Sequence, residues 1–361
     1  METLFPFGFP LPTAFYTALY VLTWTVHALL MCYVLAGGAY LAGWALIRLR
    51  SGAGREDPLA AVLRDWLPAA LGAAITAGVA PLLFLQILHK ESFYTANLLL
   101  LHRWMAVVPV LIVGFYLLYI AKSKRLDIGS AGARAATTVL AFLSLLFVAY
   151  SWTENHLLAL DRAAWTDFYA SHRLAYFDHA LLPRAAVWLF LAFPVMVTLT
   201  AWQLRGKRAD HLGGWVAFLA LAGLAIATLC AFAYHRSIPE PARQLLAGPM
   251  ARPYLVIAGI GVLLQIGAWV WQWQARRLAT AALASATIGA VLTLLGAAVA
   301  REAIRLAATD LPRAFAAHER AWEVGGMPVF LIFLLIGGAL ITWCISIARR
   351  GLRGTATQPR R

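Results

Sequence analysis

Long apolar stretches alternate with short polar connections along the chain, and this pattern predicts a membrane protein. A helix needs roughly 20 predominantly apolar residues to cross a bilayer. Nine segments reach that length, at about 13–47, 67–89, 97–121, 135–153, 182–204, 214–235, 253–274, 278–300 and 328–347. We therefore predict an all-α integral membrane protein with about nine transmembrane helices in one bundle.

The polar connections are of two kinds. Every second connection is rich in Arg and Lys, beginning with Arg48 and Arg50 after the first apolar segment. The others carry more Asp, Glu, Pro and aromatic residues, and they include the two longest connections, near 154–181 and 301–327. Because basic loops remain on the cytoplasmic side, the N-terminus is expected outside and the C-terminus inside.

Aromatic residues alternate with charges in the two longest connections at a helix-like spacing. This is typical of short amphipathic helices at a membrane interface, here on the outer side. No segment resembles a soluble domain, so residues 1–350 are expected to form one polytopic domain, followed by a basic cytoplasmic tail at 351–361. We expect no cleaved signal peptide, because a basic n-region is missing and the first apolar stretch is too long.

The composition supports the membrane prediction and narrows the possible partners. Hydrophobic residues make up 62% of the chain and charged residues 13%, whereas soluble domains are about half apolar and about a quarter charged. The net charge of +14 arises from basic residues at the ends of apolar runs. We therefore expect membrane lipid, and no nucleic acid, as a partner.

The cysteines exclude several cofactors. Cys32, Cys230 and Cys344 are far apart and form no C-x-x-C pair. The C-x-x-C-H attachment motif is absent, so no c-type heme is expected, and neither a zinc site nor a disulfide framework is indicated.

Acidic residues and lysines are almost absent from the nine predicted spans. Ion-coupled transporters normally need buried acids or a polar path, so this pattern disfavours a transporter. The ionisable and polar side chains that remain at membrane depth are mainly His, Gln and Arg.

His27 lies close to the middle of the first predicted span, on its outer side. Three interpretations are open: a structural hydrogen bond within the bundle, ligation of a heme iron, and a place in the lining of a quinone pocket. Neutral imidazole suits iron because one ring nitrogen offers a lone pair.

Most other histidines fall at or near the predicted outer face. A bis-His heme needs two such groups from different helices, and His27, His102 and His235 are the candidate iron ligands. His89 is a further candidate for cofactor binding, although a histidine at the end of a span is also typical of an interfacial anchor. The histidines on this side are His89, His102, His156, His172, His179, His235 and His318.

Arginines near the outer ends of spans are candidates for binding heme propionates. Arg103 follows His102, while Arg301 and Arg305 lie one turn apart where the eighth span ends. Arg184 and Arg236 have similar positions. The alternative is that these side chains extend along the helix to reach the membrane surface.

Amides and tyrosines within or near the spans are candidates for hydrogen bonds to quinone carbonyls. We select Gln86, Tyr94 and Gln265, with Tyr116 and Tyr150 as further possibilities. Hydrogen bonding between helices is the alternative.

The stretch YTALYVLTWTVHALLMCYVLAGGAYLAG resembles the first span of two groups of bacterial respiratory membrane subunits. In cytochrome bd subunit I an early histidine binds heme, and His27 matches it. In NrfD-like quinol-interacting subunits a Gly-rich first helix packs in the bundle, and Gly37 and Gly38 match it. The segments GVAPLLFLQILHKESFYTANLLL, LPRAAVW and GAAVAREAIRLA resemble uncharacterised multi-pass proteins of cytochrome-bearing respiratory gene sets.

The resemblance implies a role with heme b or with quinol and does not choose between the two. Together with the histidines near the outer face, the scarcity of acids in the spans and the lack of a soluble catalytic domain, it leads to the hypothesis of an electron-transfer subunit of a respiratory complex in the bacterial inner membrane. Such a subunit exchanges electrons between the quinone pool and a periplasmic partner, such as a c-type cytochrome or an iron–sulfur protein, through heme b. The G-R-Q-P-W motif of cytochrome bd subunit I is absent, so oxygen reduction by this chain is not expected. A cofactor-free anchor or assembly subunit, and a transporter, are the alternatives.

Overall fold

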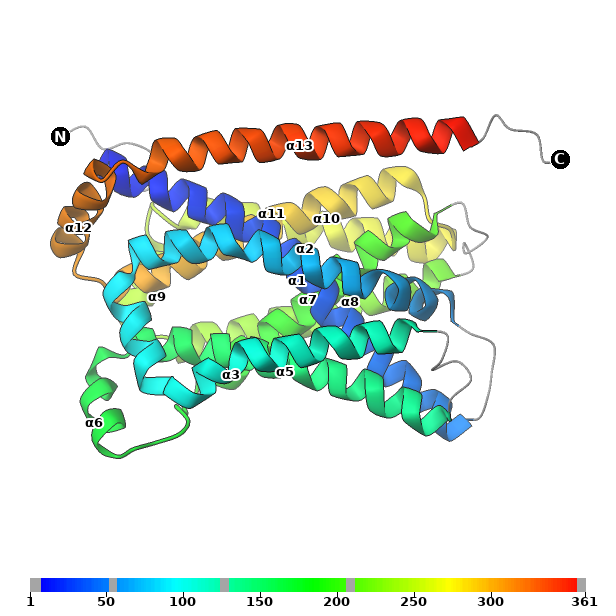
Figure 1. The fold of residues 1–361 in the computed structure, drawn as a ribbon, viewed down its shortest axis with the longest axis horizontal. Coiled ribbons are helices and arrows are strands. Elements are labelled where there is room, and N and C mark those ends of the chain that lie inside the picture. Colours follow the sequence, from blue (N-terminus) through cyan, green and yellow to red (C-terminus); the bar gives the residue numbers. More distant parts are fainter. Residues whose placement is uncertain (1–7, 52–56, 124–129, 206–211, 356–361) are drawn as a thin grey trace.

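Long helices form nearly the whole of the computed structural model, which describes residues 8–51, 57–123, 130–205 and 212–355 (Figure 1). These residues form no strands. The all-helical prediction is therefore confirmed, and within the described ranges eight helices are long and apolar enough to cross a membrane. These eight are α1 (Leu11–Ser51), α2 (Pro58–Leu88), α3 (Lys90–Lys122), α5 (Ala131–Leu160), α7 (Leu181–Leu204), α8 (Gly213–Ser237), α10 (Arg252–Ala275) and α11 (Thr280–Ala307).

The ninth predicted span corresponds to α13 (Gly326–Thr355), which follows α12 (Leu311–Glu323). The segments Leu311–Glu323 and Pro328–Leu340 meet at a bend of 70°, and they make a ninth candidate span only if they are taken together. Figure 1 shows α13 along the outside of the bundle, where Phe330 contacts Phe84 of α2 with ring centroids 5.0 Å apart. Residues 356–361 of the predicted tail lie outside the described residues.

Helix α1 lies at the centre of the bundle and packs against α2, α5, α7 and α11. Two adjacent glycines allow α2 and α5 to approach closely. A Cβ atom on Gly37 would lie 2.9 Å from Leu67, and one on Gly38 would lie 3.1 Å from Leu145. The glycine pair of α1 therefore serves helix packing.

Helices α10 and α11 cross with their backbones in close contact. The shortest distances from a Cβ atom added to a glycine are found at this crossing. A Cβ atom added to Gly261 would lie 2.6 Å from the carbonyl oxygen of Gly289. A Cβ atom on Gly296 would lie 2.5 Å from the carbonyl oxygen of Tyr254. Small residues at this crossing allow dispersion contacts along the two helices, which is the usual basis of helix association in lipid.

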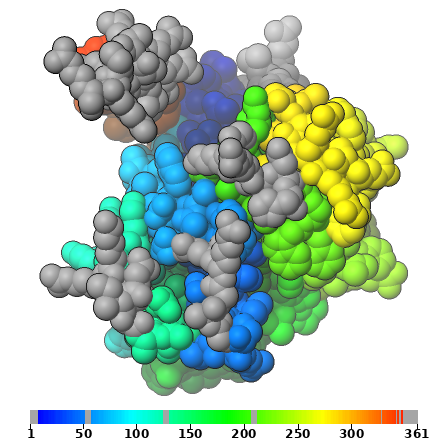
Figure 2. All heavy atoms as spheres, turned by 90° about the vertical axis from the view of Figure 1, so that its right-hand side faces the viewer, coloured from blue at the N-terminus to red at the C-terminus, as the bar shows by residue number. Residues whose placement is uncertain are grey.

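The short helices lie at one end of the bundle, which is the end where α1 begins and α2 ends. Figure 1 shows α6 (Trp165–Ala170) and α12 on its left side, and α9 (Glu240–Ala247) packs against α11 there. We call this end the α12 end. Figure 2 looks onto the opposite end, with α10 (yellow) on one side of the bundle and α3 and α5 (cyan to green) on the other.

Several helices extend well beyond their predicted spans, among them α5 and α11 at their C-terminal ends. The spans were predicted to end at 153 and 300, whereas α5 continues to Leu160 and α11 to Ala307. The hydropathy falls because these last turns contain charged residues. Glu154 and Glu302 are nevertheless buried within the bundle, with exposed fractions of 0% and 2%. The prediction that the bundle contains almost no buried acids is therefore wrong at the α12 end.

Helix α3 is divided by a kink at Leu101, whose backbone angles are φ 17° and ψ −88°. Proline disrupts the turn that precedes it, up to four residues back. Pro109 lies too far along the helix to cause this kink. The kink lies immediately before His102 and Arg103, so it sets the direction in which these two side chains leave the helix.

Candidate functional site

The α12 end contains a group of buried and half-buried polar side chains from six elements. The extended turns of α5 and α11 supply its centre, and α1, α7, α8 and the α2–α3 junction surround it. The group contains three guanidinium groups, two imidazoles, two phenols and one carboxylate. We call it the polar cluster, and it consists of Tyr20, His89, His156, Arg184, Tyr234, Arg301, Glu302 and Arg305.

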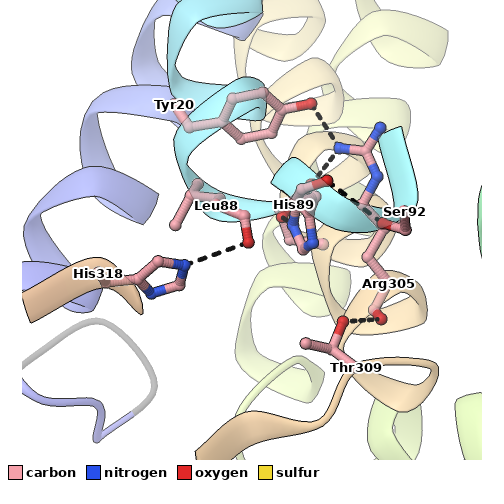
Figure 3. Close-up of polar contacts among 8 residues, drawn as sticks. Tyr20, Leu88, His89, Ser92, Arg305, Thr309 and His318 are labelled. Carbon is pink, nitrogen blue, oxygen red and sulfur yellow. Dashed lines mark hydrogen bonds and ion pairs between the residues drawn. The ribbon is translucent and has the colours of Figure 1, made fainter. Parts of the chain in front are cut away.

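Glu302 connects two cationic or potentially cationic side chains in the polar cluster. Its Oε1 accepts a 2.7 Å hydrogen bond from Arg305, and its Oε2 accepts a 2.8 Å bond from Nε2 of His89. Arg305 also donates to the hydroxyl of Tyr20 at 2.8 Å. Figure 3 shows Tyr20, His89 and Arg305 converging on this point. The carboxylate thus holds α11 to the junction of α2 and α3.

The other two arginines of the polar cluster contact aromatic rings. Arg184 donates to the hydroxyl of Tyr234 at 2.6 Å, and its guanidinium lies 5.1 Å from the centre of the same ring. The Arg301 guanidinium lies 5.3 Å from the centre of the Trp24 ring, and its Nε atom is buried without a hydrogen-bond partner. Neither arginine forms an ion pair with an acidic side chain of the polar cluster.

Among the residues that the structure describes, none forms a hydrogen bond with either ring nitrogen of His156, although only 3% of the residue is exposed. The charges of Arg184, Arg305 and Arg301 all act on it, as does His89. Buried polar groups are normally hydrogen-bonded, and each exception needs an explanation such as an absent ligand or water. His156 is therefore the side chain of the polar cluster that most clearly lacks a partner.

The polar cluster carries an excess of positive charge. Arg184, Arg301 and Arg305 lie within electrostatic range of one another, and Glu302 supplies one negative charge. Three positive charges and one negative charge leave two positive charges, even with both histidines neutral. Buried charges are costly unless they are paired, so the arrangement suits a ligand with negative groups.

Helix α12 packs against α1 and α2, and a small cavity separates it from the His89 and Glu302 side of the polar cluster. The cavity has a volume of about 10 Å³ and is lined by Thr13, Thr17, His89, Glu302 and His318, among others. This is room for roughly one water molecule. The cavity places Glu302 and His89 next to a polar space under α12.

His318 fixes α12 to the bundle. Its Nε2 lies 3.1 Å from the carbonyl oxygen of Leu88, and its Nδ1 lies 2.8 Å from the hydroxyl of Thr13 (Figure 3 shows the Leu88 bond). A carbonyl only accepts hydrogen bonds, so Nε2 carries the proton and Nδ1 accepts from Thr13. Burial lowers the pKa of His318, which favours this neutral form.

A second buried network lies beside the polar cluster at the end of α5. Glu154 accepts hydrogen bonds from Arg103 at 3.0 Å and from the backbone N–H of Tyr176 at 2.8 Å. The Tyr176 hydroxyl donates to Asp161 at 2.9 Å. Burial, together with this bond to Asp161, raises the pKa of Tyr176. Arg103 thus has a carboxylate partner and anchors the segment that follows α6.

His27 lies half-buried between α1 and α2. Its Nδ1 lies 3.0 Å from the carbonyl oxygen of Ala74 and therefore carries the proton. The ring packs on Gly78, where an added Cβ atom would lie 2.9 Å from the imidazole. Nε2 is then the nitrogen with a free lone pair, and the charge of Arg301 acts on the ring.

His102 and His235 occupy different surroundings. Both are exposed, His102 on α3 and His235 near the end of α8. The structure therefore does not gather these two imidazoles around His27. Among the other predicted residues it places His89, Arg301 and Arg305 together in the polar cluster.

The three residues selected for quinone binding lie on different helices. Gln86 is half-buried on α2, and Tyr94 on α3 is 42% exposed. Gln265 is fully buried between α10 and α11, where its Nε2 donates to the Thr293 hydroxyl at 3.0 Å. Hydrogen bonding between helices therefore describes Gln265 as the structure shows it.

His156 and Glu302 are central residues of the polar cluster that the sequence pattern did not place there. The hydropathy assigned His156 to a loop, whereas it lies in the last turns of α5. Its neighbours Glu154 and Asn155 are also buried, because they face Arg103 and Asn97. The leucines that follow at 157, 158 and 160 are the signal in the sequence that the helix continues past residue 153.

Comparison of the chain with protein-family models, curated proteins and solved structures gave no match. Within the described residues, no group of three or more His, Cys, Asp and Glu side chains is arranged to hold a metal ion. The chemistry of the site therefore follows from the polar cluster itself. A buried set of arginines with an unpartnered imidazole suits the binding of a ligand that has both acidic groups and a hydrogen-bonding or metal centre.

Proposed function

We propose that this chain is a membrane subunit of a respiratory complex. It exchanges electrons between the quinone pool and a redox partner at the α12 end, through heme b. The observation that carries the proposal is the polar cluster, in which two buried arginines, the half-buried Arg301 and two buried histidines surround a single carboxylate. A purely structural anchor would have little reason to keep two uncompensated positive charges inside an apolar bundle.

The residues present fit a heme in two respects. The excess of two positive charges matches the two carboxylates of its propionates, which Arg301 and Arg305 would bind. His27 has the arrangement that is common in metal-binding histidines, with one ring nitrogen donating to a backbone carbonyl and the other free. Heme, when bound, supplies one-electron transfer. The protein would hold the propionates, orient the His27 ring and exclude water with the aromatic residues of α1 and α7.

We also propose how the chain crosses the membrane. The chain crosses the bacterial inner membrane nine times, with α13 providing the last crossing, and α6, α9 and α12 lie in the interface. The N-terminus and the α12 end face the periplasm, where a c-type cytochrome or an iron–sulfur protein would dock. The alternation of basic and less basic connections supports this orientation.

Visible absorption spectroscopy tests the proposed function. The protein is produced in cells supplied with heme, purified in mild detergent and mixed with a quinol under anaerobic conditions. We expect a Soret band in the oxidised protein and an α band that grows on addition of quinol. A protein that lacks both bands in this preparation would contradict the heme proposal and favour a cofactor-free anchor.

A further inference from the structure

His156 and Arg184 are two buried side chains of the polar cluster to which the proposed function assigns no role. His156 is 3% exposed and has no partner on either ring nitrogen. Arg184 is 5% exposed, and its one hydrogen-bond partner in the polar cluster is the neutral hydroxyl of Tyr234. They come from different helices, α5 and α7, and the charge of Arg184 is the strongest that acts on His156.

Arg301 completes this side of the polar cluster. Its guanidinium lies against the face of Trp24, and its Nε atom is buried without a partner. Trp24 is in turn packed against Trp188 of α7, with ring centroids 5.1 Å apart. Hydrogen-bond donors from three helices therefore lie within electrostatic range of one another, and two indole rings pack on the Arg301 side.

We propose that His156, Arg184 and Arg301 form a binding site for a ligand that carries two negative charges. Arg184 and Arg301 bind its acidic oxygens, and His156 donates a hydrogen bond to it or coordinates its metal. The two indoles pack against its apolar part. Ligand classes with this chemistry are a molecule with two carboxylates and a molecule with a phosphate group.

The charge requirement follows from the side chains on every element around the site. Helix α11 supplies Arg301, Glu302 and Arg305, and α7 supplies Arg184. Helices α1 and α8 contribute the neutral Tyr20, Trp24 and Tyr234. Helix α5 contributes His156, and its buried Glu154 is paired with Arg103. His89 at the α2–α3 junction is bonded to Glu302 and adds no negative charge. Within the polar cluster only a bound anion can offset the remaining two positive charges.

The chemical identity of the ligand that supplies the two negative charges decides whether the site also supports the proposed function. If the ligand is heme, its propionates supply the charges, and in that case the inference rests on the proposed function. If the ligand is a phosphate-bearing molecule, such as a lipid with a phosphate-monoester headgroup or free phosphate, the site binds an anion and the heme proposal fails. The same two kinds of acidic oxygen would be recognised by the same arginines.

Mass spectrometry of the intact, non-denatured protein distinguishes these cases. The unaltered protein is compared with Arg184→Gln, His156→Gln and the control Arg173→Gln. Arg173 is exposed and pairs with Asp167 outside the site. We expect a bound species of defined mass in the unaltered protein and the control, and at least tenfold lower occupancy in the two site variants.

The mass identifies the source, since heme and a phospholipid differ in mass and heme also absorbs visible light. Free phosphate is tested by adding inorganic phosphate, which should raise the melting temperature of the unaltered protein and not that of Arg184→Gln. Arg184→Lys keeps the positive charge and should retain more ligand than Arg184→Gln. This comparison distinguishes an effect of the charge from an effect of misfolding. Equal occupancy in all variants, or no bound species and no effect of phosphate, would overturn the inference.

Discussion

Glu302 is one carboxylate that two neighbouring side chains share as a hydrogen-bond acceptor. It accepts hydrogen bonds from Arg305 and His89, and within the polar cluster it is the only acid. Removing one partner of a buried ion pair leaves an uncompensated charge, whereas exposed pairs contribute little. At the scale of single residues, the stability of the α12 end should therefore depend strongly on this carboxylate.

Replacement of Glu302 by alanine should destabilise the protein by about 3–5 kcal/mol, because Arg305 and His89 lose their shared acceptor. Melting temperatures of the purified protein in detergent measure the effect. Glu240→Ala is the matched control, since Glu240 forms a similar i,i+3 pair with Arg243 on an exposed surface of α9. Equal melting temperatures for the two variants would show that the buried pair has no special role.

His318 should make the stability of the protein depend on pH. Its pKa is lowered in the folded protein, so the unfolded chain binds the proton more readily. The stability from neutral His318 is complete above its ordinary pKa of about 6.5 and is lost as the pH falls below that value. Melting temperatures between pH 8 and pH 5 should fall less steeply in His318→Gln than in the unaltered protein.

The matched control for this prediction is His172→Gln, because His172 is exposed in the segment after α6. His172→Gln should keep the steep acid dependence of the unaltered protein. An identical pH dependence in His318→Gln and His172→Gln would show that other groups determine the acid sensitivity.

At the scale of helices, the apolar pattern predicts the spans well and their ends poorly. Each of the eight long helices contains one predicted span, because a run of about 20 apolar residues has few other solutions. The ends differ where charged residues pair inside the bundle, as at Glu154 with Arg103. A hydropathy profile counts such residues as polar. It contains no information about their partners, because these come from other helices.

The glycines of α10 test the packing of the helices. Gly261→Ala should destabilise the protein by about 1–3 kcal/mol, because its Cβ would meet the backbone of α11. Gly267→Ala on the same helix has open space within 4 Å and should be neutral or about 1 kcal/mol more stable. Thermal unfolding of both variants measures the difference, and equal destabilisation would contradict the close crossing.

At the scale of the whole molecule, the sequence predicts that histidines collect at one end of the bundle. It does not predict which side chains contact them. His89, Arg301 and Arg305 were predicted as site residues, and they do lie together. Their association with His156 and Arg184 depends on how α5, α7 and α11 pack around α1, which no local pattern contains. The same limit applies to His102 and His235, whose exposure is a property of the bundle.

The proposed orientation predicts opposite accessibility of the two ends. In a variant without the three native cysteines, Ser171→Cys and Arg277→Cys each add one exposed thiol, after α6 and at the opposite end. A membrane-impermeant maleimide added to spheroplasts should label Ser171→Cys, and Arg277→Cys only after the membrane is broken. The reverse pattern would place the α12 end in the cytoplasm.

The central claim is that the polar cluster binds a cofactor or other anionic ligand inside the bundle. A cryo-electron microscopy map of the purified protein in a lipid nanodisc tests it most directly. The account predicts density that contacts His156, Arg184 and Arg301, with a planar shape and a strong central peak if the ligand is heme. Continuous protein packing there, with at most ordered water next to His156, would contradict it.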